Sequence, residues 1–212
     1  MNLGGNMPHR RTLLLLPLTL AACAATPPPP QADGPPIAYT HLTQIRLDVS
    51  RIDIEDRMPV PGPADTGRDL RPTPNEAVRI MGRDRLAAFG TTHHARFSVT
   101  RAQILRTRNA AGGGLFAGDP GERLLCQLTA RVDILDVDDR RLGFAEASAE
   151  RSRNVESTVA ARRAGAEALL RQTMFDLNTE FEFQIRRALR PYIVDGSAAP
   201  PAPVGREELP RA

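Results

Sequence analysis

The chain has 212 residues, a formal net charge of +3, 41 % hydrophobic residues and only 4 % aromatic residues. This length suits one domain. Every basic residue is an arginine, and the arginines alternate with acids; without its first 22 residues the chain carries 26 basic and 25 acidic residues. Because a nucleic-acid-binding protein needs a clustered basic face, this composition argues against a nucleic-acid partner.

The first 22 residues have the order of a secretory signal. His9, Arg10 and Arg11 give a charged start, Leu13 to Leu20 are mostly apolar, and small residues follow. The segment 12–22 is about half of the ~20 residues that a transmembrane helix needs. The pattern therefore predicts a signal peptide over residues 1–22 and not a retained membrane helix.

The signal segment ends in Leu20-Ala21-Ala22-Cys23, which resembles the lipobox of bacterial lipoproteins. The resemblance implies cleavage between Ala22 and Cys23 and a lipid on the Cys23 sulfur. It also implies the outer membrane, facing the periplasm, because Ala24 stands where an Asp would mean retention at the inner membrane. An ordinary cleaved signal with a chance cysteine is the alternative.

The export route stays open. Arg10-Arg11 also loosely resembles a twin-arginine signal, although no Ser or Thr precedes the pair. Two arginines are equally the normal charged start of a general secretory signal, and Met7 could be the true first residue. The sequence does not decide between the two routes.

Three further segments follow the signal. Residues 23–40 contain Pro27 to Pro30 and Pro35-Pro36, which predicts that the lipidated cysteine continues into a stiff, extended tether. Residues 41–194 read as a single α+β domain. Residues 195–212 are rich in Pro and Ala and predict a disordered tail.

The first half of the domain predicts one strand, one loop and one helix. Residues 41–56 alternate apolar and polar residues with a slip at Ser50-Arg51, which indicates one strand with a bulge. Residues 59–73 form a long Pro-rich loop. A capping box at Thr73-Pro74-Asn75-Glu76 begins a helix that Gly90 can end. Its apolar stripe is Val78, Met81, Gly82, Leu86 and Phe89.

The second half predicts three strands and one long helix. The strand segments are 95–104, with a slip near Arg101, then 124–134 and 142–149. Helical periodicity runs from about Val155 to Tyr192. The fold class is therefore α+β, with an antiparallel four-stranded sheet, two helices on one face, and the order β-α-β-β-β-α. A single final helix of roughly 50 Å predicts a break or an overhang.

Candidate chemical sites each have a simpler structural interpretation. The adjacent His93 and His94 point to opposite faces of a strand, and Asp136, Asp138 and Asp139 read as a solvated turn without a calcium-loop pattern. The run Gly112–Gly114 lacks the setting of a phosphate loop. Cys126 falls at an inward strand position. We expect no cofactor, no metal and no enzymatic activity.

Three phenylalanines in the last helix, Phe175, Phe181 and Phe183, do not fit one narrow stripe. At least one should lie off the core, so they are a candidate partner surface. The lipobox, the tether and the order of elements together resemble small envelope lipoproteins. These include auxiliary lipoproteins of ABC-type lipid transporters and the lipopolysaccharide-assembly lipoprotein.

The resemblance implies a non-enzymatic accessory lipoprotein at the cell envelope, which is joined to the membrane by its lipid and docks on an envelope protein such as a transporter or an outer-membrane barrel. A lipid or small-molecule binding module, with a groove between sheet and helices, is the alternative. An enzyme would require His93 or His94 to meet an acid and a nucleophile in a cleft.

Overall fold

The computed structural model describes residues 35–56, 62–109 and 121–194. The signal segment, Cys23, the Gly112–Gly114 run and residues 195–212 lie outside the described residues. All the described residues belong to one compact unit. The buried core extends from Tyr39 to Leu189 and lies wholly inside this unit, which therefore contains the core that it needs to fold on its own.

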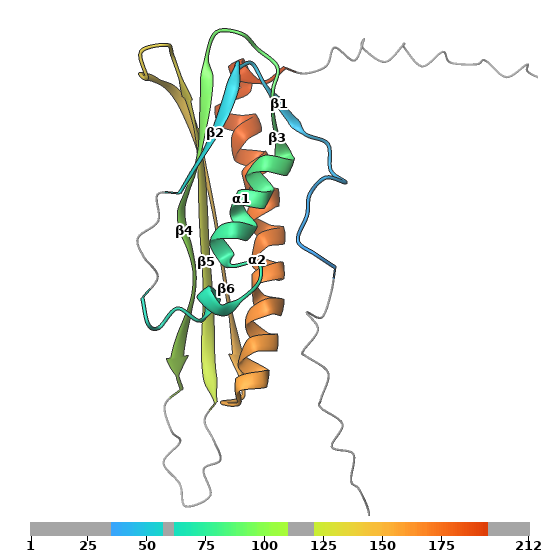
Figure 1. The fold of residues 1–212 in the computed structure, drawn as a ribbon, viewed down its shortest axis with the longest axis vertical. Coiled ribbons are helices and arrows are strands. Elements are labelled where there is room, and N and C mark those ends of the chain that lie inside the picture. The colour runs from blue at the N-terminus through green and yellow to red at the C-terminus, as the bar shows by residue number, and fades with distance from the viewer. Residues whose placement is uncertain (1–34, 57–61, 110–120, 195–212) are drawn as a thin grey trace, which may run out of the picture. The chain divides into compact units, whose positions relative to one another are not determined.

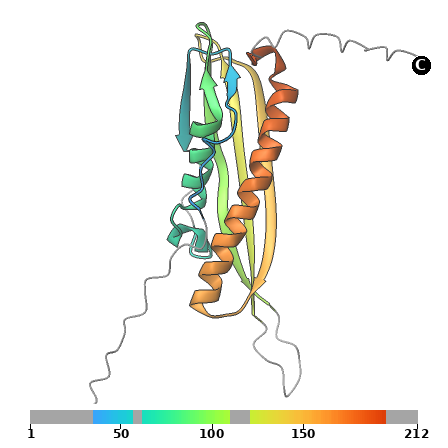
Figure 2. The ribbon, with the colours of Figure 1, turned by 90° about the vertical axis from the view of Figure 1, so that its right-hand side faces the viewer.

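The larger elements form two layers, a long sheet and two helices on one of its faces (Figures 1 and 2). The four-stranded sheet has the order β2-β4-β5-β6, and a two-stranded sheet pairs β1 with β3. In chain order the elements are β1 (Ile45–Leu47), β2 (Arg51–Asp56), the 3-10 helix η1 (Thr66–Asp69), α1 (Pro74–Arg85), β3 (Leu86–Ala88), β4 (His94–Arg108), β5 (Glu122–Leu135), β6 (Arg141–Val155), α2 (Val159–Ala188) and the 3-10 helix η2 (Arg190–Tyr192).

The prediction of a purely antiparallel sheet is wrong at its first strand. β2 pairs with β4 in parallel, whereas the pairs β4–β5 and β5–β6 are antiparallel. The reason is the connection: α1 lies between β2 and β4, and such a crossover returns the chain in its original direction. The α+β class and the two helices on one face are as predicted. The predicted order β-α-β-β-β-α is wrong, because the short strands β1 and β3 form a second sheet of their own.

The predicted single strand over residues 41–56 is also wrong. The chain breaks after Leu47 and resumes at Arg51, because the two halves pair with different partners. β1 lies beside β3, and β2 lies beside β4. Two backbone hydrogen bonds stabilise the chain at this break: the Val49 amide donates to the Leu47 carbonyl, and the Ser50 amide donates to the His93 carbonyl. The slip in the sequence pattern therefore marks a change of partner and not a bulge.

Helix α1 begins as predicted and ends earlier. The capping box is complete: Thr73 accepts from the Glu76 amide, and the Glu76 carboxylate accepts from the Thr73 amide. The helix ends at Arg85, because Leu86 is already extended and enters β3, so Gly90 does not cap it. A Cβ on Gly82 would lie 2.7 Å from the Phe97 ring, which explains the glycine at this close approach to the sheet.

The slip predicted near Arg101 is confirmed as an irregularity in the β4–β5 register between Val99 and Arg101. β2 ends opposite Val99, so the part of β4 that follows Val99 has no β2 residues beside it. The loop before α1 covers this edge of β4. Asp65 is buried and its Oδ1 accepts from the amides of Ile104 and Gly67, at 3.0 and 2.8 Å.

Helix α2 is one unbroken helix of 30 residues, so the predicted break is absent. β4 and β6 have 15 residues each, and at about 3.4 Å per residue they match the ~45 Å length of the helix. The end of the helical segment still lies over the sheet, because a Cβ on Gly143 would be 3.2 Å from Leu189. Within the described part of the chain, no helix is both long and apolar enough to cross a bilayer.

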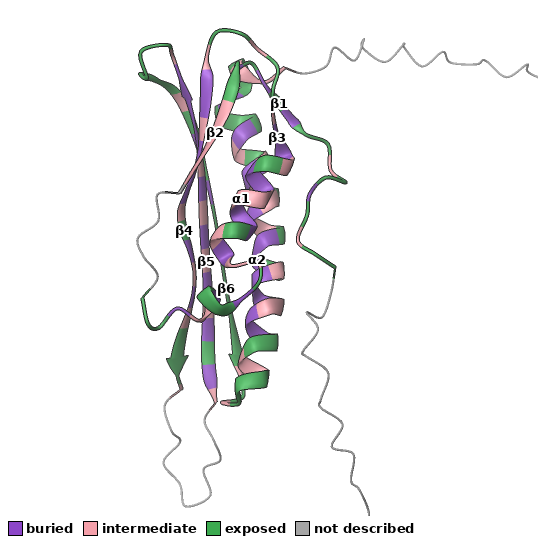
Figure 3. Ribbon diagram, in the orientation of Figure 1, coloured by how far each residue is buried: buried purple, intermediate pink, exposed green. Residues whose placement is uncertain are grey.

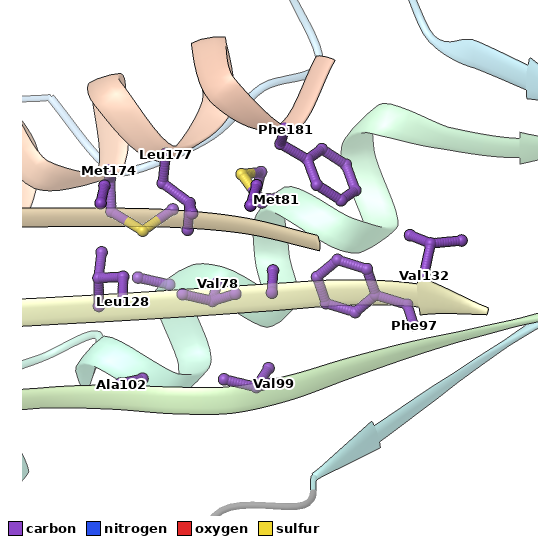
Figure 4. Packing of buried hydrophobic residues seen from close by; sticks show 14 of the residues in the cluster. Val78, Met81, Phe97, Val99, Ala102, Leu128, Val132, Met174, Leu177 and Phe181 are labelled. Carbon is purple, nitrogen blue, oxygen red and sulfur yellow. The ribbon is translucent and has the colours of Figure 1, made fainter. Parts of the chain in front are cut away.

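The core fills the layer between the helices and the sheet (Figures 3 and 4). Phe97 on β4 and Phe181 on α2 meet edge to face, with ring centroids 5.7 Å apart. Small alanines on β6, at positions 145, 147 and 149, lie under α2 and let it approach the sheet closely. The middle of this layer is filled, whereas a groove of about 500 Å³ remains between the end of β6 and the first turns of α2.

Candidate functional site

The chain enters the domain beside the middle of α2. Arg171 on this helix donates to the Pro35 carbonyl oxygen. Tyr39 is buried: its amide donates to Asp84 at 2.8 Å and its hydroxyl donates to the Met174 carbonyl at 3.4 Å. Burial, with the nearby Asp84 carboxylate, raises the pKa of Tyr39 to about 12. The packed domain therefore includes residues that precede His41.

The three phenylalanines proposed as a partner surface separate. Phe181 is buried against Phe97, so it belongs to the core and takes no part in such a surface. Phe175 is 72 % exposed and Phe183 is 54 % exposed. Their spacing with the exposed Thr179 places all three at successive turns on the outer side of α2. We call Phe175, Thr179 and Phe183 the outer stripe.

The two histidines lie on different sides of the entry to β4. The His93 ring lies edge-on to Tyr192, with centroids 6.1 Å apart. The buried His94 Nε2 is 3.0 Å from Asp139 Oδ1 in the β5–β6 turn. Among the described residues, no hydroxyl or thiol is hydrogen-bonded to either ring, so the His94–Asp139 pair has no adjacent nucleophile. This contact joins the turn between β5 and β6 to the first residue of β4.

Two other candidates have structural roles. Asp136 Oδ1 accepts from the amides of Asp138 and Arg140, both at 2.9 Å, which confirms a turn. The Arg140 amide is also the main cause of the lowered pKa of Asp136. Cys126 is buried, and burial raises the pKa of its thiol to about 12 although a hydrogen bond with Thr173 opposes this. No three potential metal ligands cluster among the described residues.

A groove of about 320 Å³ lies between the η1 segment and the first turns of α2. Four arginines from three elements line it: Arg68 from η1, Arg106 from β4, and Arg162 and Arg163 from α2. The apolar lining residues are Pro63, Leu70, Val159 and Ala166. We call this the arginine groove.

Three carboxylates accompany the four guanidinium groups. Glu122 is buried beneath the arginine groove and is 3.2 Å from Arg162 and 3.7 Å from Arg106, so one acid serves two bases. Asp69 lies 3.8 Å from Arg68. Glu167 lies 3.1 Å from Arg163. The groove therefore carries a net positive charge.

The helix terminus adds to this charge. No acidic residue stands in the first turn of α2, and its fourth and fifth residues are Arg162 and Arg163. A helix N-terminus carries a partial positive charge and is normally stabilised by acids, so arginines here oppose the helix dipole. The sequence shows this feature as Arg162-Arg163 four and five residues after the Thr158 cap, and our sequence analysis did not single it out.

The comparisons with known proteins do not assign a family. No protein-family model matches the chain, and no curated protein matches it. Similar solved structures include a Xanthomonas campestris protein with 14 % identity and a TM-score of 0.32, which covers 68 % of this chain and 94 % of that chain. Both values are too low to support an argument about function.

Two other similar structures are named as lipoproteins. The first, a protein from Caulobacter crescentus assigned as a lipoprotein, has 12 % identity and a TM-score of 0.30, covering 62 % of this chain and 88 % of that chain. The second, a minor lipoprotein from Acinetobacter baumannii, has 14 % identity and a TM-score of 0.28, covering 70 % of this chain and 98 % of that chain. Their identities and TM-scores are also too low to support an argument about function.

Proposed function

We propose that this chain is a lipid-anchored, periplasm-facing accessory lipoprotein that acts without catalysis in envelope lipid transport or outer-membrane assembly. The observation that carries the proposal is the lipobox-like Leu20 to Cys23 directly ahead of a domain that has its own core. A lipid on Cys23 would join this domain to a membrane through the chain between Cys23 and Pro35.

The length of that connection limits how far the domain can stand from the membrane. Twelve residue steps separate Cys23 from Pro35, the first described residue. At most ~3.6 Å per residue, the connection reaches about 40 Å. Helix α2, at 30 residues, is about 45 Å long. Either end of the domain can therefore face the membrane, and the outer stripe stays within reach of a membrane-bound partner.

The partner surface that we propose is the outer stripe. Phe175 and Phe183 are large apolar side chains held in water on a rigid helix, and aromatic anchors of this kind are enriched where proteins bind one another. An envelope protein, either a transporter or an outer-membrane barrel, is the partner that the anchored location implies.

The test is crosslinking in cells with the tagged wild type beside Cys23→Ser, followed by membrane fractionation and identification of the crosslinked protein. The wild type is expected in the outer-membrane fraction with an envelope partner, and Cys23→Ser is expected to lose both. A Cys23→Ser protein that fractionates like the wild type would overturn the anchored reading.

A small-molecule binding module remains the second candidate. A groove of about 500 Å³ lies between the end of β6 and α2, and the arginine groove also lies open at the surface. Loss of the crosslinked partner in a Phe175→Ser, Phe183→Ser double variant would favour the accessory role over the binding module.

A further inference from the structure

We propose that the arginine groove binds the anionic headgroup of a phospholipid in the membrane to which the domain is anchored. The inference deepens the proposed function and rests on it for the location of the membrane. It assigns the ligand class, a phosphate-bearing lipid headgroup, to a surface formed by η1, β4 and α2.

The first support is the donor set. Guanidinium groups are planar, always charged, and suited to paired hydrogen bonds with phosphate oxygens. The arginine groove brings four of them together from segments as far apart in sequence as Arg68 and Arg163. Arg68, Arg106 and Arg163 have side chains that are 53 %, 40 % and 46 % exposed, so they can reach an incoming anion.

The second support is an imbalance that an anion would correct. Arg162 donates to both oxygens of the buried Glu122 and to the Ser157 carbonyl, so Arg106, which lies 3.7 Å from Glu122, shares a carboxylate that Arg162 already occupies. The start of α2 adds its own partial positive charge, and no acid in its first turn compensates for it. An anion at this point would meet both the arginines and the helix terminus.

The third support is the apolar part of the lining. Val159 is 74 % exposed at the first position of α2, and the exposed Pro63 lines the same groove. A free inorganic anion would leave these two side chains in water, whereas the glycerol and first methylene groups of a lipid can cover them. This combination of charge and apolar surface favours a lipid headgroup over free phosphate.

The geometry of the anchor agrees with this placement. Arg171, which holds the Pro35 carbonyl, lies eight residues beyond Arg163, or about 12 Å along the helix. The connection to Cys23 reaches about 40 Å, so the chain can place the N-terminal end of α2 against the membrane surface.

The test uses residues 32–212, which contain the whole core and lack Cys23, so that any vesicle binding comes from the domain itself. Sedimentation with vesicles of equal parts phosphatidylglycerol and phosphatidylcholine is compared with pure phosphatidylcholine vesicles. The groove variant is Arg68→Gln with Arg163→Gln. The matched control is Arg187→Gln with Arg190→Gln, which removes the same charge from exposed positions in the last turn of α2 and in η2.

We expect binding to the mixed vesicles only, a loss of about tenfold or more in the groove variant, and a change within about twofold in the control, because the effect of a charge falls off within ~10 Å of the surface. Equal losses in both variants would mean a general basic surface and would overturn the proposal. Equal binding to pure phosphatidylcholine, or no vesicle binding, would also overturn it.

A calorimetric titration with inorganic phosphate separates the two sources of the anion. Phosphate binding without vesicle binding would assign the groove to a free anion and reject the lipid. Thermal melts of all variants establish that each is folded. Residues 32–212 lack Cys23, so a failure of vesicle binding does not affect the Cys23→Ser fractionation result. If instead the fractionation experiment fails, vesicle binding by residues 32–212 is still judged by its own controls.

Discussion

Arg85, the last residue of α1, donates from Nη2 to the Glu182 carboxylate on α2 while its side chain is only 2 % exposed. The same guanidinium donates from Nε to Asn178 Oδ1 at 3.0 Å and from Nη1 to the Thr43 carbonyl. One buried cation therefore joins both helices and the segment before β1. Such a group must keep its partners, because an unpaired buried charge is costly.

Arg85→Met should lower the free energy of unfolding by about 1–3 kcal/mol, because it leaves the Thr43 carbonyl and Asn178 Oδ1 without their donor, while Glu182 keeps Arg186 as a partner. Urea denaturation followed by circular dichroism measures this. Arg83→Met, on the exposed side of the same helix, is the control and should change stability by less than about 0.5 kcal/mol. Similar values for the two variants would contradict the assigned role of Arg85.

Gly82→Ala should destabilise the domain by about 1–3 kcal/mol although alanine is the better helix former. The added Cβ would lie 2.7–2.9 Å from three atoms of the Phe97 ring, which is itself fixed against Phe181. Gly62→Ala is the control, because nothing lies within 4 Å of its Cβ position. Thermal unfolding of the two variants checks this; a more stable Gly82→Ala protein would show that the helix and sheet can separate slightly at no cost.

The outer stripe and the core should respond differently to truncation. Phe181→Ala should cost about 3–5 kcal/mol, because it empties a buried aromatic site. Phe175→Ser and Phe183→Ser should each change the unfolding free energy by less than about 0.5 kcal/mol, because both side chains are mostly exposed. Chemical denaturation of the three variants gives the comparison, and a large loss in either serine variant would assign that residue to the fold.

The capping box gives a defined pH dependence. The pKa of Glu76 is lowered in the folded protein, first by the hydrogen bond that its carboxylate accepts from the Thr73 amide. The unfolded chain then binds the proton more readily, so the stabilisation is present above the ordinary glutamate pKa of about 4.3 and is lost as the pH falls through the lowered folded-state value.

Glu76→Gln should therefore lower the free energy of unfolding near neutral pH. The difference in this free energy between the variant and the wild type should shrink as the pH falls below about 4. Urea unfolding at a series of pH values measures the difference between the two proteins, which removes the contribution of the other carboxylates. A difference that stays constant across the acid range would exclude this hydrogen bond as the cause.

Cys126 should be inert in the folded protein. Its thiol pKa is about 12 because of burial, so almost no thiolate forms at neutral pH. In residues 32–212 it is the only cysteine, and a thiol reagent such as dithionitrobenzoate should label it only after unfolding in denaturant. Rapid labelling under native conditions would show that β5 opens locally near Cys126.

Local chemistry in the sequence predicted several features that the structure confirms. The capping box of α1 and the turn at Asp136 each depend on residues within a few positions of one another, and the irregularity near Arg101 shows as a local slip in the alternation of apolar and polar residues. Hydrogen bonds and steric limits at this range act the same way in any fold, so they can be read from the order of residues.

The features that the sequence did not predict depend on partners far apart in the chain. The break between β1 and β2 follows from pairing with β3 and β4 some forty residues later. The burial of Arg85 depends on Glu182, and the arginine groove depends on η1, β4 and α2 meeting at one end of the sheet. Alternation of apolar and polar residues carries no information on which partner an edge will find.

The sequence by itself determined the caps and the main helix and strand segments, together with the lipobox-like Cys23 and the near-neutral balance of arginines and acids. Tertiary structure alone decided that β2 runs parallel to β4, that Phe181 is buried while Phe175 and Phe183 are exposed, and that four arginines share one groove. The physical reason is that packing and charge clustering are properties of contacts between distant segments, which only the folded chain brings together.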